Sequence, residues 1–362
     1  MAGTQKLIPW WATSFTNGEA EAAARAVTER HLSQGPITEL FEQALAEYLG
    51  VPHVVAVTSG TSALTLALMA HGIGPGDEVL VPNRTWVATA HSVQILGATP
   101  IFIDTEPDRP VMEVSTAHRH VTSRTKAVIP VHMNGRSVNM AATNAFAATA
   151  GLVVIEDSAQ ALGSLDQQGR ALGTLSKAGC FSLSVAKIIS TGQGGFIATH
   201  DAVTDKNLRA VRTHGVENTV EPNQWVMPGF NFRFTDILAS IGLVQLGLLP
   251  ERVRRQRQVY AFYEAGLEGS DSAHLIPQRA GEVGPYIEVL TKERDQLVTF
   301  LRLRGIETRA FYPDLDAAPY WNFDGRLINS RVFGREGLYL PSGPSITDEQ
   351  IERVVSGVKD FH

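Results

Sequence analysis

Three short segments carry residue types whose spacing could support chemistry. The first is Thr58–Leu64 (TSGTSAL), which stands between an apolar run and a helical pattern. Free backbone N–H groups at a helix start, with hydroxyl groups beside them, form a binding site for phosphate. Ser and Thr at such a position are more often simple helix caps. Taken alone, the segment therefore fits both a phosphate site and a cap.

The second segment is an acidic pair, Glu156-Asp157, at the end of the apolar run 152–155. Ligands of open α/β sheets bind at the carboxyl ends of the strands, where this pair is expected. The Asp157 carboxylate could bind a metal, act as a general base, or hold the protonated ring nitrogen of a cofactor that withdraws electrons. A helix-capping role for Asp157 is the structural alternative.

The third segment places one lysine, Lys187, between two apolar runs and ahead of the glycine-rich stretch 190–195. Partly apolar surroundings disfavour the ammonium form, which lowers the pKa of a lysine and frees its amine to form a Schiff base. A lone lysine more often extends to the surface, so this alternative stays open.

The elements that must position these segments follow from seven short apolar runs. Each run is rich in Val, Ile or Phe and is bounded by Gly, Pro, Asp or Asn, which predicts strands. The runs are 53–57, 78–82, 100–104, 127–132, 152–156, 180–184 and 195–199. The first four gaps hold helical patterns at 62–70, 86–96, 114–121 and 140–149. We predict an α/β fold whose large domain has three α/β/α layers around a mixed, mostly parallel seven-stranded sheet.

The pattern changes after residue 199 to longer helices, predicted at 235–249 and 252–266, with a break at Pro250. We take this break as a domain boundary. Residues 1–249 then form the large domain, with an N-terminal helical segment, and residues 250–362 form a small α+β domain. The predicted elements of the small domain are strands at 285–290 and 307–311 and helices at 294–304 and 348–358.

Composition narrows the class of protein. The 362 residues are 44% hydrophobic and 19% charged, and the net charge of −6 is not gathered in blocks, so we expect no nucleic-acid or membrane surface. A single cysteine, Cys180, excludes an internal disulfide and fits a reducing compartment. With no apolar stretch long enough to span a membrane, the sequence indicates a cytoplasmic protein. No residue is assigned to a metal.

In their order and spacing, the three segments resemble the DegT/DnrJ/EryC1/StrS sugar aminotransferases, which are pyridoxal-phosphate (PLP) enzymes of fold type I. The resemblance runs over nearly the whole chain. Further matching segments are 41–42, 48–50, 72–79, 85–89, 156–163, 182–195 and 229–236. Gln193 and Asn139 depart from the acidic residues common in the family. These departures leave the identity of the sugar substrate open, whereas the residues expected to bind the cofactor are unchanged.

The resemblance implies a role for each cofactor residue. Lys187 corresponds to the Schiff-base lysine, which also moves the proton between substrate and cofactor, and Asp157 to the carboxylate on the pyridinium nitrogen. Trp86 corresponds to the aromatic residue stacked on the ring, and Gln160 to the residue near the ring hydroxyl. The positions that correspond to phosphate contacts are Gly60, Thr61, Ser62 and Ser182.

The resemblance also implies partners. Asn231 corresponds to a residue that reaches the cofactor phosphate of the other subunit, which implies a homodimer with two shared sites. His132, Arg233 and Tyr312 are the candidate substrate contacts. Lys187 argues against the related reaction in which a histidine replaces the lysine and the sugar is dehydrated.

The implied reaction is transfer of an amino group from L-glutamate or glutamine to a keto sugar, with pyridoxamine phosphate as the intermediate cofactor form. Residues 305–313 are similar to perosamine-type 4-aminotransferases. This similarity favours a nucleotide-linked 4-keto-6-deoxyhexose, as used in lipopolysaccharide O-antigen. Amination at C3, an inosose substrate, and a sugar-binding homologue without turnover stay open.

Among other fold type I reactions, a desulfurase would need a catalytic cysteine, whereas Cys180 lies within a predicted strand.

Overall fold

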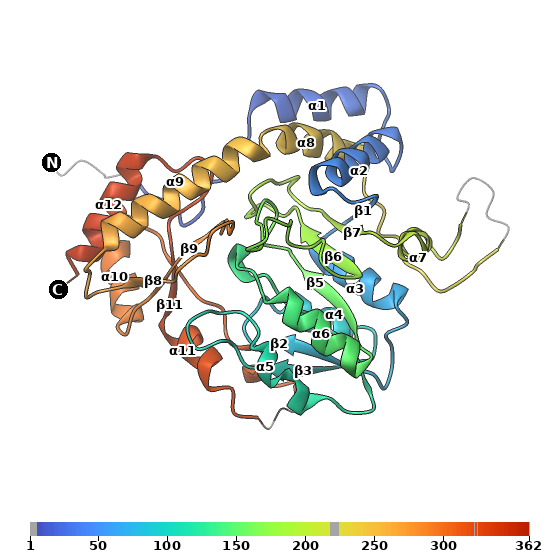
Figure 1. The fold of residues 1–362 in the computed structure, drawn as a ribbon. Helices are drawn as coiled ribbons and strands as arrows, with labels where there is room; N and C mark the ends of the chain where they lie inside the picture. Colours follow the sequence, from blue (N-terminus) through green and yellow to red (C-terminus); the bar gives the residue numbers. More distant parts are fainter. Residues whose placement is uncertain (1–5, 218–223, 322, 324, 362) are drawn as a thin grey trace.

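A computed structural model describes residues 6–217, 224–321, 323 and 325–361. The large domain is built on a seven-stranded sheet in the order β1-β7-β6-β5-β4-β2-β3. The strands are β1 His53–Val57, β2 Glu78–Pro82, β3 Thr99–Ile103, β4 Thr125–Val128, β5 Val153–Asp157, β6 Ala178–Ser182 and β7 Gly195–Thr199. Each predicted run overlaps one of these strands, and β4 and β6 begin two residues earlier than predicted. The predicted seven-stranded α/β fold is confirmed (Figure 1).

Strand β7 runs against both of its neighbours, whereas the other pairs in the sheet are parallel. The cause lies in the connection from β6 to β7, residues 183–194, which contains no helix and is described throughout. A connection without a crossover helix returns the chain in the opposite direction. Lys187 lies on this connection, and is therefore held next to the carboxyl ends of β5 and β6.

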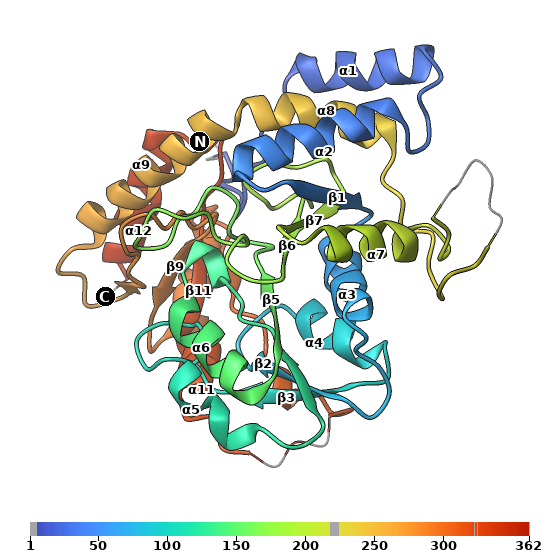
Figure 2. The same cartoon turned by 45° about the vertical axis from the view of Figure 1, so that its right-hand side comes forward.

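Helices cover both faces of the sheet. Val54 and Ala56 of β1 pack in the same core as Phe41 of α2, whereas Val55 and Val57 pack in the core that includes α3. This alternation is the period of two expected for a strand buried on both faces. The helices of the large domain are α1 Asn17–Thr28, α2 Pro36–Leu49, α3 Gly60–Ala70, α4 Ala88–Gln94, α5 Val114–Ala117, α6 Met140–Ala150, α7 Ala202–Arg212 and α8 Asp236–Gly247. Figures 1 and 2 both show α1, α2 and α8 stacked together above β1.

Two helix boundaries differ from the prediction in ways that matter for the site. Helix α4 begins at Ala88, so Trp86 lies in the loop after β2 instead of in the helix. Pro250 lies in the first turn of α9, Leu249–Leu267, and the break falls at Leu248 instead. A proline is tolerated in the first turn because the N–H that it lacks would have no partner there.

The small domain has a four-stranded antiparallel sheet in the order β10-β11-β9-β8. Its strands are β8 His274–Leu275, β9 Ile287–Leu290, β10 Arg309–Ala310 and β11 Gly337–Leu340, and its helices are α9, α10 Arg294–Leu303, α11 Ile328–Glu336 and α12 Asp348–Lys359. N-terminal residues also join this domain, because the N–H of Ile8 donates to the Gly305 carbonyl at 2.9 Å and the Ile8 side chain is buried in its core. The boundary at residues 249–250 stays a prediction.

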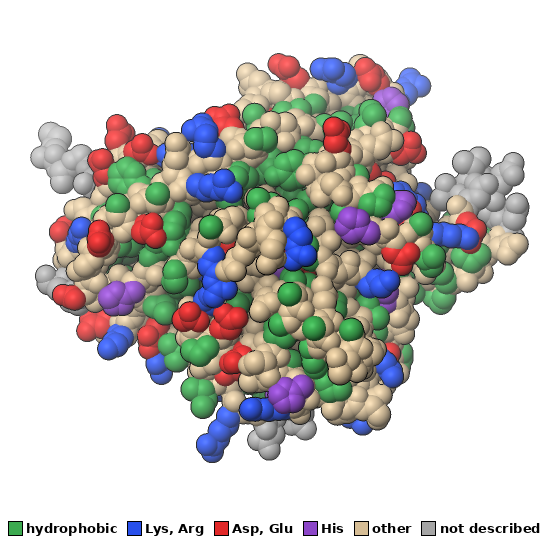
Figure 3. Space-filling model, in the orientation of Figure 1, with side chains coloured by type: hydrophobic (Ala, Val, Ile, Leu, Met, Phe, Trp, Pro, Cys, Tyr) green, Lys and Arg blue, Asp and Glu red, His purple; other side chains and the backbone are tan. Residues whose placement is uncertain are grey.

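The surface is mixed in charge. On the face drawn in Figure 3, basic and acidic side chains are interspersed over both domains. Among the described helices, none is long and apolar enough to cross a membrane.

Candidate active site

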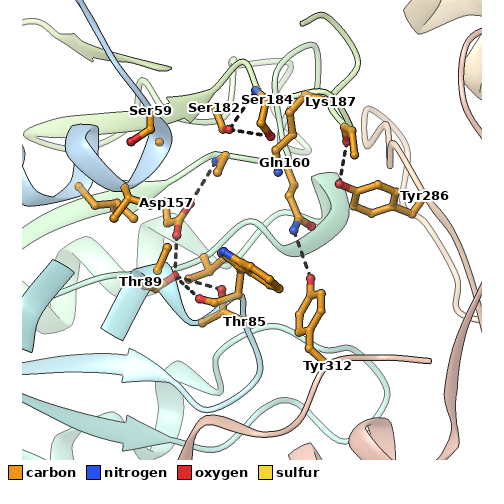
Figure 4. Close-up of a pocket in the computed structure, with 18 of the residues that line it drawn as sticks. Ser59, Thr85, Thr89, Asp157, Gln160, Ser182, Ser184, Lys187, Tyr286 and Tyr312 are labelled. Atoms are coloured by element: carbon orange, nitrogen blue, oxygen red, sulfur yellow. Dashed lines mark hydrogen bonds between the residues drawn. The ribbon is translucent and has the colours of Figure 1, made fainter. Parts of the chain in front are cut away.

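The three segments meet at one cavity of about 370 Å³, a size in the usual range for ligand pockets. Its wall comes from the turn between β1 and α3, the loop after β2, the ends of β5 and β6, and the β6–β7 connection (Figure 4). The lining residues that the sequence predicted are Gly60, Thr61, Trp86, Asp157, Gln160, Ser182, Lys187 and Tyr312. Parallel strand ends converge on one edge of a sheet, which explains why segments so far apart in sequence lie together.

Asp157 is the buried acidic group of the cavity. Its carboxylate accepts hydrogen bonds from the Thr89 hydroxyl at 2.7 Å and from the Ala159 N–H at 3.1 Å. Burial raises the pKa of Asp157, and these two bonds and the charge of Lys187 act in the opposite direction. The carboxylate is thus fixed in orientation and faces a low-polarity space, where a cationic partner would stabilise its charged form.

Lys187 is the basic group that faces this carboxylate across the cavity. Burial lowers the pKa of Lys187 to about 8, against the attraction of Asp157, which raises it. An exposed lysine has a pKa of about 10.4. About a tenth of the Lys187 amine is therefore uncharged at pH 7, far more than for an exposed lysine, and can act as a nucleophile.

The turn before α3 presents the groups that an anion-binding cup would need. Ser59 caps the helix by accepting a hydrogen bond from the Ser62 N–H at 3.0 Å, and the N–H groups of Gly60 and Thr61 belong to the first turn, which has no intrahelical partners for them. A Cβ atom at Gly60 would lie 2.9 Å from the Cβ of Ser182, so glycine allows the turn to approach the end of β6. The Ser182 hydroxyl donates to Ser184 at 3.3 Å beside this turn.

Trp86, Gln160 and Tyr312 line one side of the cavity, and Figure 4 shows Gln160 and Tyr312 below Lys187. The Trp86 ring meets the Tyr312 ring edge to face, with 5.4 Å between centroids. The Gln160 amide donates to the Tyr312 hydroxyl at 3.3 Å and accepts from the Asn134 N–H at 2.9 Å. These contacts join the end of the large sheet to a segment of the small domain.

The geometry of a lysine, a buried carboxylate and a phosphate cup agrees with the comparison to known families. The model of the DegT/DnrJ/EryC1/StrS aminotransferase family matches residues 14–359. The chain belongs to this family. It is thus an aminotransferase, and the expected enzyme class is confirmed.

Relatives of this aminotransferase act on sugars, according to their names. It is 37% identical over 332 residues to a GDP-perosamine synthase of Caulobacter vibrioides, with 88% of each chain covered. It is 33% identical to a GDP-perosamine synthase of Escherichia coli O157:H7, with 99% of each chain covered. Among solved structures, DesV of S. venezuelae in complex with a ketimine intermediate has a TM-score of 0.94 at 31% identity and covers 99% of each chain.

Aminotransferases of this family use PLP, and the residues of the cavity fit that cofactor. The cup at α3 suits a phosphate, the Asp157 carboxylate suits a protonated ring nitrogen, and the Lys187 amine suits an aldehyde. Gly60 allows its turn to pack directly on Ser182, so that the two predicted phosphate contacts lie side by side. The expected cofactor is confirmed by the family.

Four predicted site residues of the aminotransferase lie outside the cavity wall. The Ser62 hydroxyl is turned away and donates to the Ser59 carbonyl at 2.9 Å. His132 is fully buried, with Nε2 2.9 Å from Glu156 and Nδ1 accepting from the Val138 N–H at 3.2 Å. Both ring nitrogens of His132 are thus occupied, and Ser62 and His132 act on the site only through their neighbours. This corrects the predictions that Ser62 binds the cofactor and His132 binds substrate.

Asn231 and Arg233 also lie away from the cavity wall. Asn231 is exposed, and its side-chain oxygen accepts a hydrogen bond from Arg233 at 2.9 Å. The backbone of Arg233 pairs with Val57 at the end of β1. Within this chain neither side chain lines the pocket, so a role for Asn231 in a shared site stays a prediction, and so does substrate binding by Arg233.

Several wall residues were not predicted. Ser59, Thr85, Thr89 and Ser184 lie within or beside the predicted segments, and the spacing of Thr85 and Thr89 by one helical turn is a signal that was available. The other unpredicted wall residues with aromatic or charged side chains are Trp10, Tyr286, Arg309 and Tyr339. Arg309 lies in the segment 305–313 that resembles perosamine-type enzymes, whereas Trp10, Tyr286 and Tyr339 come from distant parts of the chain and carry no local pattern that marks a site.

Proposed function

We propose that this enzyme transfers an amino group from L-glutamate or L-glutamine to the ketone carbon of a nucleotide-linked 4-keto-6-deoxyhexose. The donor leaves as its 2-oxo acid, and the ketone becomes an amine. The observation that carries the proposal is the meeting of Lys187 and Asp157 at the α3 cup, in a chain 37% identical to a GDP-perosamine synthase. Arg309 and Tyr312, from the segment 305–313, line the same cavity.

PLP, when bound, supplies an electron sink for the carbon that loses its proton. Asp157 contributes by holding a proton at the ring nitrogen, and its bonds from Thr89 and Ala159 keep the carboxylate in one orientation. The first-turn N–H groups of α3 and the Ser182 hydroxyl would hold the phosphate, and Trp86 would cover the ring.

Lys187 has two tasks in this scheme. Its Nζ would hold the aldehyde of the cofactor before substrate arrives, and once released it would take a proton from the donor Cα and deliver it to the former aldehyde carbon of the cofactor. Both tasks need an amine that gains and loses a proton near neutral pH. The lowered pKa of Lys187, about 8, suits this requirement.

A second candidate is amination at C3 of a nucleotide sugar. The observation in its favour is 33% identity, over 95% of this chain, to a dTDP-3-amino-3,4,6-trideoxy-alpha-D-glucose transaminase of Streptomyces venezuelae. Because both reactions use the same cofactor groups, the sugar pocket alone distinguishes them. An inosose substrate and a homologue without turnover have no comparable support.

The deciding experiment starts from the pyridoxamine-phosphate form of the purified enzyme. It is incubated with GDP- and dTDP-linked 4-keto and 3-keto deoxyhexoses, and products are identified by mass and NMR. We expect a 4-amino product from the GDP-linked sugar, with return of the PLP spectrum. A 3-amino product would establish the second candidate, and binding without amino transfer to any sugar would remove both.

The proposal also covers the oligomeric state, the cellular location and the pathway of the enzyme. A homodimer, a cytoplasmic location and a role in O-antigen synthesis all fit a sugar-nucleotide enzyme. Support for a polysaccharide role comes from the 30% identity to the spore coat polysaccharide biosynthesis protein SpsC of Bacillus subtilis.

A further inference from the structure

One basic side chain of the cavity has no role in binding the cofactor. Of the described residues that line it, those with acidic or basic side chains are Asp157, Lys187 and Arg309. In the proposed scheme the first two serve the ring nitrogen and the aldehyde of the cofactor. The guanidinium of Arg309 has no cofactor role in that scheme. Its charge is therefore free to act on a substrate.

The surroundings of Arg309 leave its guanidinium ready for an anion. Arg309 pairs with Tyr339 in the small sheet, and its guanidinium carbon lies 5.0 Å from the centre of the Trp10 ring. Within the described ranges, the side chain makes no ion pair or hydrogen bond. Stacking on an indole holds the guanidinium plane by its face and leaves the N–H edge free to donate.

Arg309 also stands on the side of the cavity that carries Lys187. Trp10, on which it stacks, packs against Tyr286 with 5.9 Å between ring centres, and the Tyr286 hydroxyl donates to the Ala186 carbonyl at 2.7 Å. Ala186 immediately precedes Lys187, and Figure 4 shows Tyr286 beside that lysine. Burial raises the pKa of Tyr286, and the positive charge of Arg309 opposes this rise, which agrees with their proximity.

We propose that Arg309 recognises a carboxylate of the acidic amino donor, L-glutamate, and of its 2-oxo acid product. The inference rests on the proposed function. Every carboxylate of a five-carbon diacid lies within a few bonds of the carbon that reacts near Lys187. The diphosphate of a nucleotide sugar, by contrast, is separated from the C4 ketone by the hexose ring. A planar guanidinium matches a carboxylate through two parallel hydrogen bonds.

Binding of glutarate tests this directly, because glutarate is a diacid without an amino group and cannot react. Its affinity for the holoenzyme is measured by calorimetry for the wild type, Arg309→Gln, Arg309→Lys and the control Arg302→Gln. Arg302 is an exposed arginine at the end of α10, outside the cavity wall. We expect Arg309→Gln to weaken glutarate binding roughly 10- to 100-fold, Arg309→Lys to weaken it less, and Arg302→Gln to leave it unchanged.

A second measurement separates donor from sugar. With L-glutamate alone, the PLP spectrum converts to that of pyridoxamine phosphate, and half-conversion should need correspondingly more glutamate in Arg309→Gln. The KM of the keto sugar should change by less than about twofold. Cofactor content and near-UV circular dichroism verify that each variant is folded and loaded.

The outcomes separate this inference from the proposed function. Unchanged glutarate affinity in Arg309→Gln overturns the inference, and so does a rise confined to the KM of the sugar, which would assign the guanidinium to the diphosphate. If glutamate converts the cofactor and glutarate binding depends on Arg309, yet no keto sugar is aminated, then the sugar substrate is wrong and the inference on Arg309 stands.

Discussion

Lys187 has to lose its proton before its amine can attack an aldehyde. The low-polarity wall around it stabilises the neutral form, whereas Asp157 stabilises the charged one. The balance leaves a pKa of about 8, so the reactive amine forms as the pH rises through this value. At the residue scale, burial and the charge of Asp157 thus set the pH range in which Lys187 would act as the proposed nucleophile.

A pH prediction follows for the apo-protein. The rate of PLP capture, followed by absorbance, should rise with pH and reach half of its maximum near pH 8, because the neutral amine accumulates above the pKa of Lys187. A midpoint near 10.4, the value of an exposed lysine, would contradict the assignment of the lowered pKa.

The position of the covalent link can be mapped. Borohydride reduces a Schiff base to a stable secondary amine, so the reduced protein should carry the cofactor on the peptide that contains Lys187. Lys187→Ala should retain pyridoxamine phosphate through the α3 cup but complete no repeated turnover. Lys177→Ala, which alters an exposed lysine, is the matched control and should behave as wild type. Labelling of another lysine in the wild type would remove Lys187 from the mechanism.

Asp157→Asn separates charge from shape. The amide oxygen can still accept from the Ala159 N–H, and the amide NH2 can donate to the Thr89 hydroxyl, so cofactor affinity should change by less than about tenfold. Without the carboxylate the ring nitrogen loses its proton, and turnover should fall about 100- to 1,000-fold, as for loss of one electrostatic group. Steady-state kinetics and cofactor titration measure the two effects. Lost cofactor binding with normal turnover of the remaining holoenzyme would make Asp157 a structural residue.

At the scale of elements, the site depends on a contact between the end of β2 and the small domain. Arg84 is buried and donates to Asp314 at 2.7 Å and to the Tyr312 carbonyl, and the carbonyl of Asn83 accepts from the Leu315 N–H at 3.1 Å. Trp86 follows two residues after Arg84 and meets the Tyr312 ring. The ion pair of Arg84 and Asp314 therefore positions both aromatic residues.

Loss of this ion pair should be costly. Arg84→Met leaves the mostly buried Asp314 carboxylate without its partner, which should lower the free energy of unfolding by about 3–5 kcal/mol. Chemical denaturation measures this change. The double variant Arg84→Met/Asp314→Leu should recover much of the loss, because no buried charge remains. The control Arg335→Met breaks an ion pair whose arginine is exposed, and should cost less than about 1 kcal/mol. Equal effects of Arg84→Met and Arg335→Met would argue against a buried pair.

The regularity of each element decides how much of the fold and of the site could be predicted from the sequence. Strands such as β1 and β5 were found because their Val- and Ile-rich runs end at turn residues, and Asp157 and Lys187 were found because they follow such runs. The two-residue strand β10 lies within the predicted strand 307–311, but the sequence did not show that Arg309 lines the cavity, because this depends on tertiary contacts. His132 was misplaced because a loop after a strand resembles a pocket wall until the Glu156 contact is known.

On the scale of the whole molecule, the cavity lies where the two domains meet. Tyr286, Arg309, Tyr312 and Tyr339 come from residues 250–362, and the proposed cofactor groups come from residues 1–249. Packing of the four-stranded sheet against the large sheet therefore completes the pocket around the proposed cofactor site. The segment that contains Asn231 lies outside this pocket, with the Asn231 side chain exposed.

The last prediction concerns a second copy of the chain. If Asn231 serves the cofactor of a neighbouring subunit, the segment 229–233 must cross a two-fold interface at which both subunits contribute the same surface. Mixed Lys187→Ala and Asn231→Ala subunits, each inactive alone, should then form heterodimers in which one site carries both lesions and the other carries neither. The intact site should restore up to about half of the wild-type activity per heterodimer. Differently tagged subunits establish that exchange has occurred. Confirmed exchange without recovered activity would mean that Asn231 acts within its own chain, and the shared-site arrangement would be wrong.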